Sequence, residues 1–279
     1  MTVERMLPLY EAKMIHQFDH RWATYGADGK VRDATLEEKQ DPNFQALPRY
    51  WVREEVVDDR ISGRWEREWL LGWRDICRST DERTMIAAIN GAGASPEGGT
   101  LLAMPDREMG SLALLAIWNS FVFDFVSRQK VGGTHLKYFT MRQLPTPCPE
   151  MLDGHVPWQP DLAWHEWLSV RAGVLVLDAV DMQPLGDDLA LCAADEPWEP
   201  RFRERVRGEL DAGCFHLFGV NRDDADYILG AFPIVKRKDE AAFGTFRTKD
   251  LILEIYDEMQ RAVDSGEEYE GLIIGSARG

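Results

Sequence analysis

Residues 112–129, LALLAIWNSFVFDFVSRQ, are apolar on nearly every side of the helix that they would form. A helix that is hydrophobic all round is stable only when its whole surface is buried. We therefore predict a core helix from Asp106 to about Gln129. This helix decides the fold, because the elements before and after it must pack against it.

The segment that follows this helix is free of carboxylates. No Asp or Glu occurs from Phe125 to Pro149, although the chain of 279 residues has a formal charge of −16. Glycines at 132 and 133 let the backbone approach a ligand closely. Basic side chains can neutralise phosphates, and polar ones can contact base edges. The candidate DNA contacts here are Arg128, Lys130, Gly132, Gly133, Thr134, His135, Lys137, Tyr138 and Arg142. A solvated loop that lacks acids by chance is the alternative.

The two halves of the chain differ strongly in charge. Residues 1–150 hold 19 Lys and Arg against 22 Asp and Glu, whereas residues 151–279 hold 13 against 26. A strongly acidic domain repels phosphate backbones. We therefore expect two domains with different roles, residues 1–150 and residues 151–279, with the boundary in the cluster Pro145–Pro149.

The patterning predicts an α+β fold, in which a mixed α/β domain is followed by a mainly helical domain. In the first half the expected extended segments are 7–25 with a polar turn at 26–30, 50–52, 84–89 and 101–104. A loop is expected over 31–48, and residues 65–77 change from helix to strand. In the second half the expected helices are 161–182, 197–220, one capped by Asn221, and one that begins at Thr248.

Composition limits the cellular setting. The four cysteines (Cys77, Cys148, Cys192, Cys214) have no CxxC spacing, which argues against a structural zinc site and favours a reducing compartment. Neither an apolar leader nor an apolar run of about 18 residues occurs. We expect a soluble, cytoplasmic protein without a membrane partner.

No motif for catalysis is present. Neither GxSxG nor HExxH occurs, and the glycine-rich segment 90–99 precedes another strand, so it is interpreted as a surface loop. His16, Asp19 and His20 would share one face of a helix as metal ligands, but their surroundings read as extended, which separates the histidines by about 13 Å. Polar contacts are the preferred interpretation. We predict a second, weaker set of DNA contacts from His16, Gln17, His20 and Arg21.

Several separated segments resemble one known family. LLAIWNSFVFDFVSRQKVGGTHLKYFTMRQLPTPCP (114–149) resembles the closing element of target-recognition domains in the TaqI-like specificity region of N6-adenine DNA methyltransferases, and more distantly that of type I specificity subunits. PLYEAKMIHQFDHRWATY (8–25), PRYWV (48–52), LGWRDICRSTDERTMIAA (71–88) and residues 209–257 also resemble this group. Together they are similar to the C-terminal third of type IIG restriction–modification methyltransferases and of related phage-defence enzymes.

The resemblance implies a module that recognises a DNA sequence for an N6-adenine methyltransferase. Family members carry an Asn/Asp-Pro-Pro-Tyr/Phe motif and a donor site upstream. The nearest match here, Asp41-Pro42-Asn43-Phe44, lacks the second proline. We therefore expect no catalysis by this chain alone, and S-adenosylmethionine on a partner subunit or on a missing domain of a longer protein. The alternatives are a free-standing methyltransferase and an assembly module that uses the apolar helix 111–126 without touching DNA.

Overall fold

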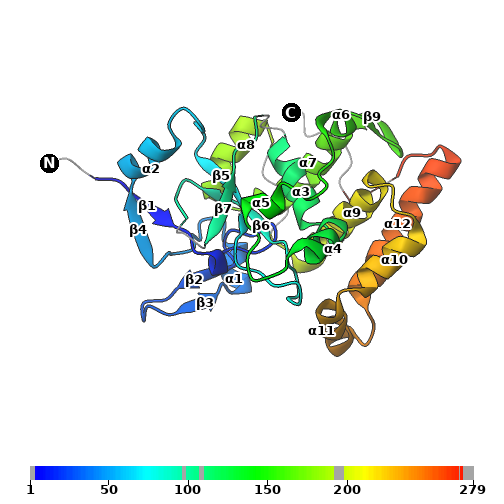
Figure 1. Ribbon diagram of the computed structural model, residues 1–279, viewed down its shortest axis with the longest axis horizontal. Coiled ribbons are helices and arrows are strands. Elements are labelled where there is room, and N and C mark those ends of the chain that lie inside the picture. Colours follow the sequence, from blue (N-terminus) through cyan, green and yellow to red (C-terminus); the bar gives the residue numbers. More distant parts are fainter. Residues whose placement is uncertain (1–3, 96–98, 107–109, 192–197, 270, 273–279) are drawn as a thin grey trace.

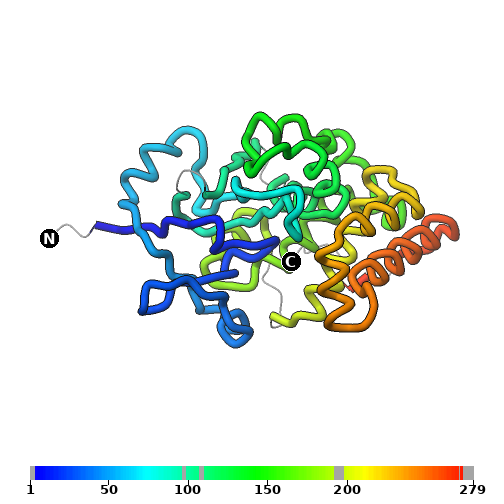
Figure 2. Tube along the Cα trace, turned by 60° about the horizontal axis from the view of Figure 1, so that its bottom comes forward, coloured from blue at the N-terminus to red at the C-terminus, as the bar shows by residue number. Residues whose placement is uncertain are grey.

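The computed structural model describes residues 4–95, 99–106, 110–191, 198–269 and 271–272, and has the α+β fold that the sequence predicts. Small antiparallel sheets fill the N-terminal end, and helices α10–α12 form the opposite end (Figure 1). Figure 2 shows the same separation from a second direction. The strands of the first part are β1 (Met6–Leu9), β2 (Ala23–Tyr25), β3 (Val31–Asp33), β4 (Tyr50–Arg53), β5 (Trp69–Arg74), β6 (Ala87–Gly91) and β7 (Thr100–Ala103).

The largest sheet among the described residues has three antiparallel strands in the order β6-β5-β7. Leu71 in the middle strand faces Ile89 on one side and Ala103 on the other. Both strands that the sequence predicts around the glycine-rich segment are therefore present, and each pairs with β5 rather than with the other. This arrangement leaves β5 buried, which suits its run of Trp and Leu residues.

Two smaller sheets complete the N-terminal end. Strand β1 pairs with β4, and β2 pairs with β3 across the polar turn expected at 26–30. The predicted loop 31–48 contains β3 and a short helix, α1 (Leu36–Gln40), which Thr35 and Glu38 stabilise through a capping box. Another helix, α2 (Glu54–Ile61), follows β4, and a 3₁₀ turn lies at Ala12–Met14.

The predicted core helix is two helices, α3 (Gly110–Asn119) and α4 (Phe121–Lys130), bent by 67°. Asn119 causes the break, because its side-chain amide bonds both the N–H and the C=O of Ala87 in β6, at 2.9 and 3.0 Å. Ser120 then caps α4 by accepting from the Phe123 N–H at 3.3 Å. Both helices are largely buried. The apolar surface of residues 111–126 therefore packs into the core of this chain and is not free to bind another protein.

Within the described residues, no individual helix combines the length and the apolar character needed to cross a membrane. The bent pair α3–α4 meets those criteria only when its two members are taken together.

The second half of the chain is mainly helical, as predicted. After short helices α5 (Tyr138–Met141) and α6 (Pro149–Leu152), a hairpin of β8 (His155–Val156) and β9 (Gln159–Ala163) precedes the main helices. These are α7 (Trp164–Val176), α8 (Gln183–Leu189), α9 (Pro200–Leu217), α10 (Arg222–Gly230), α11 (Pro233–Phe243) and α12 (Arg247–Ser265). A second 3₁₀ turn lies at Val180–Met182.

Most of the expected helix boundaries agree with the structure. Asn221 caps α10 by accepting from the N–H groups of Asp223 and Asp224. The prediction of one helix over 161–182 is wrong at both ends, because Leu162 and Ala163 belong to β9 and the helix stops at Val176. The sequence reading also missed α11.

One hydrophobic core joins the two halves of the chain. Helix α3 lies between β6 on one side and α7 on the other, and α9 packs against α7, α4 and α12. Helices α7 and α9 approach so closely at Gly213 that an added Cβ would lie 2.5 Å from the Trp167 ring. The expected boundary at residue 150 therefore falls within a shared core.

Candidate nucleic-acid interface

The middle of the acid-free segment forms a turn that is bonded to the residues immediately after β5. The Cys77 N–H donates to the Thr134 C=O at 3.1 Å, and the Leu136 N–H donates to the Asp75 C=O at 2.8 Å. The indole N–H of Trp73 donates to the Leu136 C=O, also at 2.8 Å. Residues 130–142, here called the glycine turn, are therefore fixed to a buried strand rather than suspended in solvent.

A buried carboxylate holds the middle of the glycine turn. Asp75 is fully buried, and its Oδ2 lies 2.6 Å from Lys137 Nζ and 3.2 Å from His135 Nδ1. Both partners are half-exposed, so each presents an outer edge while its inner edge is bound to the carboxylate. Two of the predicted DNA contacts thus also anchor the turn.

The remaining cations of the glycine turn have no acidic partner among the described residues. Lys130 and Arg142 are exposed and form no ion pair. Sequence reasoning missed a third exposed cation, Arg78, because it lies about 50 residues earlier in the chain. Its guanidinium forms no ion pair with a described residue, although its backbone N–H donates to Asp81 Oδ2 at 2.9 Å. The isolated bridge between Ile76 and His135 brings its segment beside the turn.

The two glycines of the turn are exposed, and nothing in the fold requires them to be glycines. Neither has a positive φ, and a Cβ added at either position would meet no atom within 4 Å. Thr134, the next residue, is also exposed. The absence of side chains therefore leaves the backbone open to approach from outside.

Arg128 does not belong to this exposed surface, which corrects the sequence-based prediction. Its Nε lies 3.3 Å from Asp124 Oδ1, and its Nη2 donates to the C=O groups of Asp81 and Glu82 at 2.7 Å. The guanidinium stacks over the Phe232 ring at 4.0 Å. Burial lowers its pKa, against the opposing effect of Asp124. Arg128 stabilises the junction of α4 with the preceding loop.

Tyr138 has a mixed role. Its hydroxyl donates to the Leu102 C=O at 2.9 Å and accepts from the Leu102 N–H at 3.1 Å, which ties α5 to β7. Its ring meets Trp73 edge-on and remains partly exposed. Phe139 beside it is 69% exposed. The ring faces of Tyr138 and Phe139 are the aromatic surface of this region.

The second set of predicted DNA contacts is mostly buried, which corrects that prediction. Arg21 is 1% exposed, and its guanidinium donates to the C=O groups of Lys39, Asp41, Phe44 and Asp178. Gln17 donates to the C=O groups of Met85 and Asn119. His20 lies 3.1 Å from both Asp181 oxygens. Arg21 and His20 connect the N-terminal segment to the helical half through Asp178 and Asp181, whereas Gln17 bonds within the first half of the chain.

Arg21 belongs to a polar group that we call the Arg21 cluster, formed by Asp19, Arg21, Lys39, Asp178 and Arg203. Asp19 binds the Lys39 ammonium, and Asp178 binds Arg21 at 3.3 Å and Arg203 at 2.9 Å. The chain 41–44 wraps around the Arg21 guanidinium. The nearest match to a methyl-transfer motif is therefore a structural loop.

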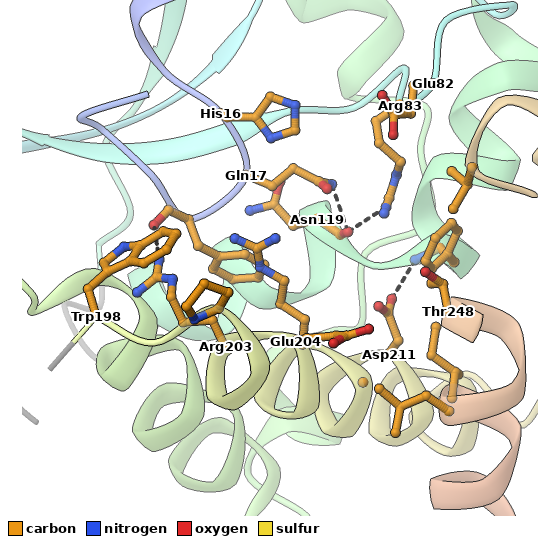
Figure 3. Close-up of a pocket in the computed structure, with 18 residues that line it drawn as sticks. His16, Gln17, Glu82, Arg83, Asn119, Trp198, Arg203, Glu204, Asp211 and Thr248 are labelled. Carbon is orange, nitrogen blue, oxygen red and sulfur yellow. Dashed lines mark hydrogen bonds between the residues drawn. The ribbon is translucent and has the colours of Figure 1, made fainter. Parts of the chain in front are cut away.

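His16 forms an isolated bridge with Asp19 across a tight turn, outside any strand, and lines a cavity of about 290 Å³ (Figure 3). Its ring stacks on Trp22, with centroids 4.4 Å apart. Burial, with Arg74 and Arg207 nearby, lowers the pKa of His16 to about 3, so the ring is neutral at physiological pH. In Figure 3, Arg203, Glu204 and Asp211 project from α9 toward the side where His16 and Gln17 lie.

The histidines and carboxylates of the predicted segment do not converge on a metal. Asp19 is bound to Lys39, and His20 to Asp181. Over the described ranges, no group of three or more His, Cys, Asp or Glu side chains has an arrangement that could hold a metal ion.

Comparison with known proteins gives no match to a family model, to a curated protein or to a solved structure.

Proposed function

We propose that this chain recognises a DNA sequence for an N6-adenine DNA methyltransferase of a restriction–modification or phage-defence system. The observation that carries the proposal is the glycine turn, where Lys130 and Arg142 are exposed without an acidic partner among the described residues of a chain of formal charge −16. The exposed guanidinium of Arg78, in the neighbouring segment, also forms no ion pair with a described residue. A positive surface that persists against so negative an overall charge suits a polyanion.

The geometry of the turn supports contact with a duplex. Lys130 and Arg142 would neutralise phosphates, and the exposed N–H groups around Gly132 and Gly133 could donate to a phosphate or a base edge. The half-exposed His135, together with Thr134 and Tyr138, would lie nearest the groove. Asp75, just after β5, and Trp73, within it, hold these groups in place, as sequence recognition requires.

Catalysis is assigned to another domain or subunit. The segment 41–44 has its carbonyl groups bound to Arg21, so it offers no pocket for a flipped adenine. We propose that S-adenosylmethionine binds the partner methyltransferase and that the acidic helical half keeps the duplex on the turn by repulsion.

A salt titration tests the proposal. Binding of the full chain to a labelled DNA duplex is measured by anisotropy over a range of low salt concentrations, for wild type, Lys130→Ala and Arg142→Ala. Each lost phosphate contact should lower the log–log salt slope by about 0.9. Lys236→Ala on α11 is the matched control, since this exposed lysine already faces Glu240 at 3.8 Å. Equal slopes in all four proteins would remove the glycine turn from the interface.

One observation favours a second function, an assembly module without DNA contact. Phe139 and Ile76 expose 69% and 56% of their surface beside the glycine turn, and large exposed apolar patches mark protein interfaces. This function predicts that no duplex binds even at low salt. It also predicts that Phe139→Ser, and not Lys130→Ala, abolishes binding to the partner methyltransferase.

A further inference from the structure

The cavity in Figure 3 contains an arginine without an acceptor. Arg207 lies on α9, and its Nε is buried and makes no hydrogen bond; no oxygen of the described residues accepts from any of its nitrogens. Burial, with Arg203 nearby, lowers its pKa to about 10, so the group is still a cation at neutral pH. The Nε of Arg203, which lines the same cavity and is 4% exposed, also has no partner.

The other arginines and the glutamates of the cavity are already paired. Arg83 binds Asp124 at 2.6 Å, and Arg203 binds Asp178 at 2.9 Å. At the rim, Glu82 binds Lys238, and Glu204 binds Arg247 at 2.7 Å. This pairing leaves Arg207 as the cation of the cavity without a counter-ion in the described parts of the chain.

Asp211 does not supply the missing counter-ion. It lies one helical turn after Arg207 on α9, but no ion pair within 4.0 Å joins the two. Its Oδ1 accepts from the Phe121 N–H at 2.8 Å instead. Burial raises the pKa of Asp211 to about 6, against the lowering effect of the nearby Arg83. The fold thus places both groups in one cavity without joining them.

An unpaired guanidinium in a cavity costs stability. A partly desolvated charge without a partner is unfavourable by several kcal/mol in general, and unpaired buried polar groups are rare in folded proteins. Such groups persist where a ligand completes them. A cavity of about 290 Å³ is close to the lower end of ordinary small-molecule sites, so the ligand would be small.

We propose that this cavity binds a small monoanion of the carboxylate class, with Arg207 as its counter-ion and the free Nε–H of Arg203 as an additional donor. A guanidinium matches a carboxylate with two parallel hydrogen bonds. A doubly charged phosphate fits less well, because Glu82, Glu204 and Asp211 line the same cavity and repel a second negative charge more strongly.

This site is separate from the glycine turn. Phe121 at the start of α4 lines the cavity, whereas Lys130 ends the same helix, which spans about 15 Å over its 10 residues. The test of the carboxylate site is therefore independent of the test of DNA recognition.

Arginine Nε–H NMR signals test the site directly. The Arg207 signal is assigned by its loss in Arg207→Gln, and the full chain is titrated with acetate, with inorganic phosphate, and with chloride at matched ionic strength. We expect the Arg207 and Arg203 signals to shift in a saturable way with acetate, more weakly with phosphate and not with chloride. Arg205→Gln, two residues earlier on α9 and paired with Glu258, is the control and should leave the response unchanged.

A stability comparison separates a ligand site from a structural one. Arg207→Gln should keep or raise the Tm of the ligand-free protein, by about 2–4 °C for each kcal/mol gained. Arg203→Gln should lower it, because Asp178 loses the closer of its two arginine partners. Acetate should raise the Tm of wild type but not of Arg207→Gln. The proposal would be overturned if Arg207→Gln lowered the Tm as much as Arg203→Gln does. It would also be overturned if acetate still raised the Tm of Arg207→Gln, or if acetate did not change the Tm of wild type. Tighter binding of phosphate than of acetate would overturn its carboxylate preference.

Discussion

The Arg21 cluster and the glycine turn use the same kinds of residue in opposite ways. In the Arg21 cluster, Arg21 is enclosed, and four carbonyl groups and Asp178 accept from its guanidinium. At the glycine turn, Lys130 and Arg142 are exposed and have no partner among the described residues. Internal pairing, rather than charge, therefore distinguishes the cations that hold this fold together from those that can serve a ligand.

The difference has an energetic basis. A buried guanidinium loses its hydration and is tolerated only when hydrogen bonds replace the lost water. An exposed ammonium keeps its hydration and contributes roughly 0–1 kcal/mol even when it is paired. Substitutions in the Arg21 cluster should therefore change stability, whereas substitutions of Lys130 and Arg142, the unpaired cations of the glycine turn, should change binding.

The largest effect is expected at Arg21. Arg21→Met would strand the C=O groups of Lys39, Asp41 and Phe44, and should lower the free energy of unfolding by about 3–5 kcal/mol in urea titrations. Lys236→Met, which removes an exposed pair with Glu240, should lower it by less than about 0.5 kcal/mol. Equal losses in the two variants would contradict the comparison.

Asp211 is an intermediate case, since it is buried but has no bound cation. The pKa of its carboxyl is 3.8 in the unfolded chain and about 6 in the folded one, so wild type loses stability as the pH rises through this window. Asp211→Asn keeps an oxygen for the Phe121 N–H and avoids that loss. Its advantage should be near zero at pH 3.8 and reach about 2–3 kcal/mol above pH 6, measured by urea unfolding at several pH values. An advantage that does not change with pH would show that folding does not raise the pKa of Asp211.

The sequence predicted the elements whose signals are local. Pro200, Gly219 and Asn221 mark helix ends that the structure has nearly where they were expected. The break in the core helix was missed, because it depends on the side chain of Asn119 bonding Ala87, which lies 32 residues earlier. No local pattern reveals such a pairing.

Of the predicted DNA contacts, too, the sequence identified only those whose position depends on neighbouring residues. Lys130, Arg142 and the two glycines are on the surface, as the acid-free window suggested. Arg128, Gln17, His20 and Arg21 are internal, because their partners come from distant segments such as Asp124, Asp181 and Asp178. The chain shows which residues carry charge, whereas only the fold shows which of these charges are paired.

Lys130 and Lys137 provide a test within the glycine turn itself, since they are the same residue type seven positions apart. Lys137→Met should lower the free energy of unfolding by about 1–3 kcal/mol, because the fully buried Asp75 loses its closest partner. Lys130→Met should change it by less than about 0.5 kcal/mol. The measurement is urea unfolding of both variants. If Lys130→Met lowered the free energy of unfolding more than Lys137→Met, the ion pair between Lys137 and Asp75 would not be what stabilises the glycine turn.

Substitution of the two glycines should change stability only modestly, and with the opposite sign. Neither Gly132 nor Gly133 has a positive φ or a neighbour within 4 Å of an added Cβ. Replacing both with Ala should raise the free energy of unfolding by about 0.4–1 kcal/mol each, since Ala restricts the unfolded chain. If the turn contacts DNA through its backbone, the two methyl groups should nevertheless weaken binding.

Gly230→Ala on α10 is the matched control, because an added Cβ there also meets no atom within 4 Å. It should raise stability by a similar amount and leave DNA affinity unchanged. The two quantities are measured by urea unfolding and by anisotropy with a labelled duplex at low salt. A double variant that is more stable and binds DNA as tightly as wild type would show that the glycines do not face the duplex, and the cations around them would then have to act at long range.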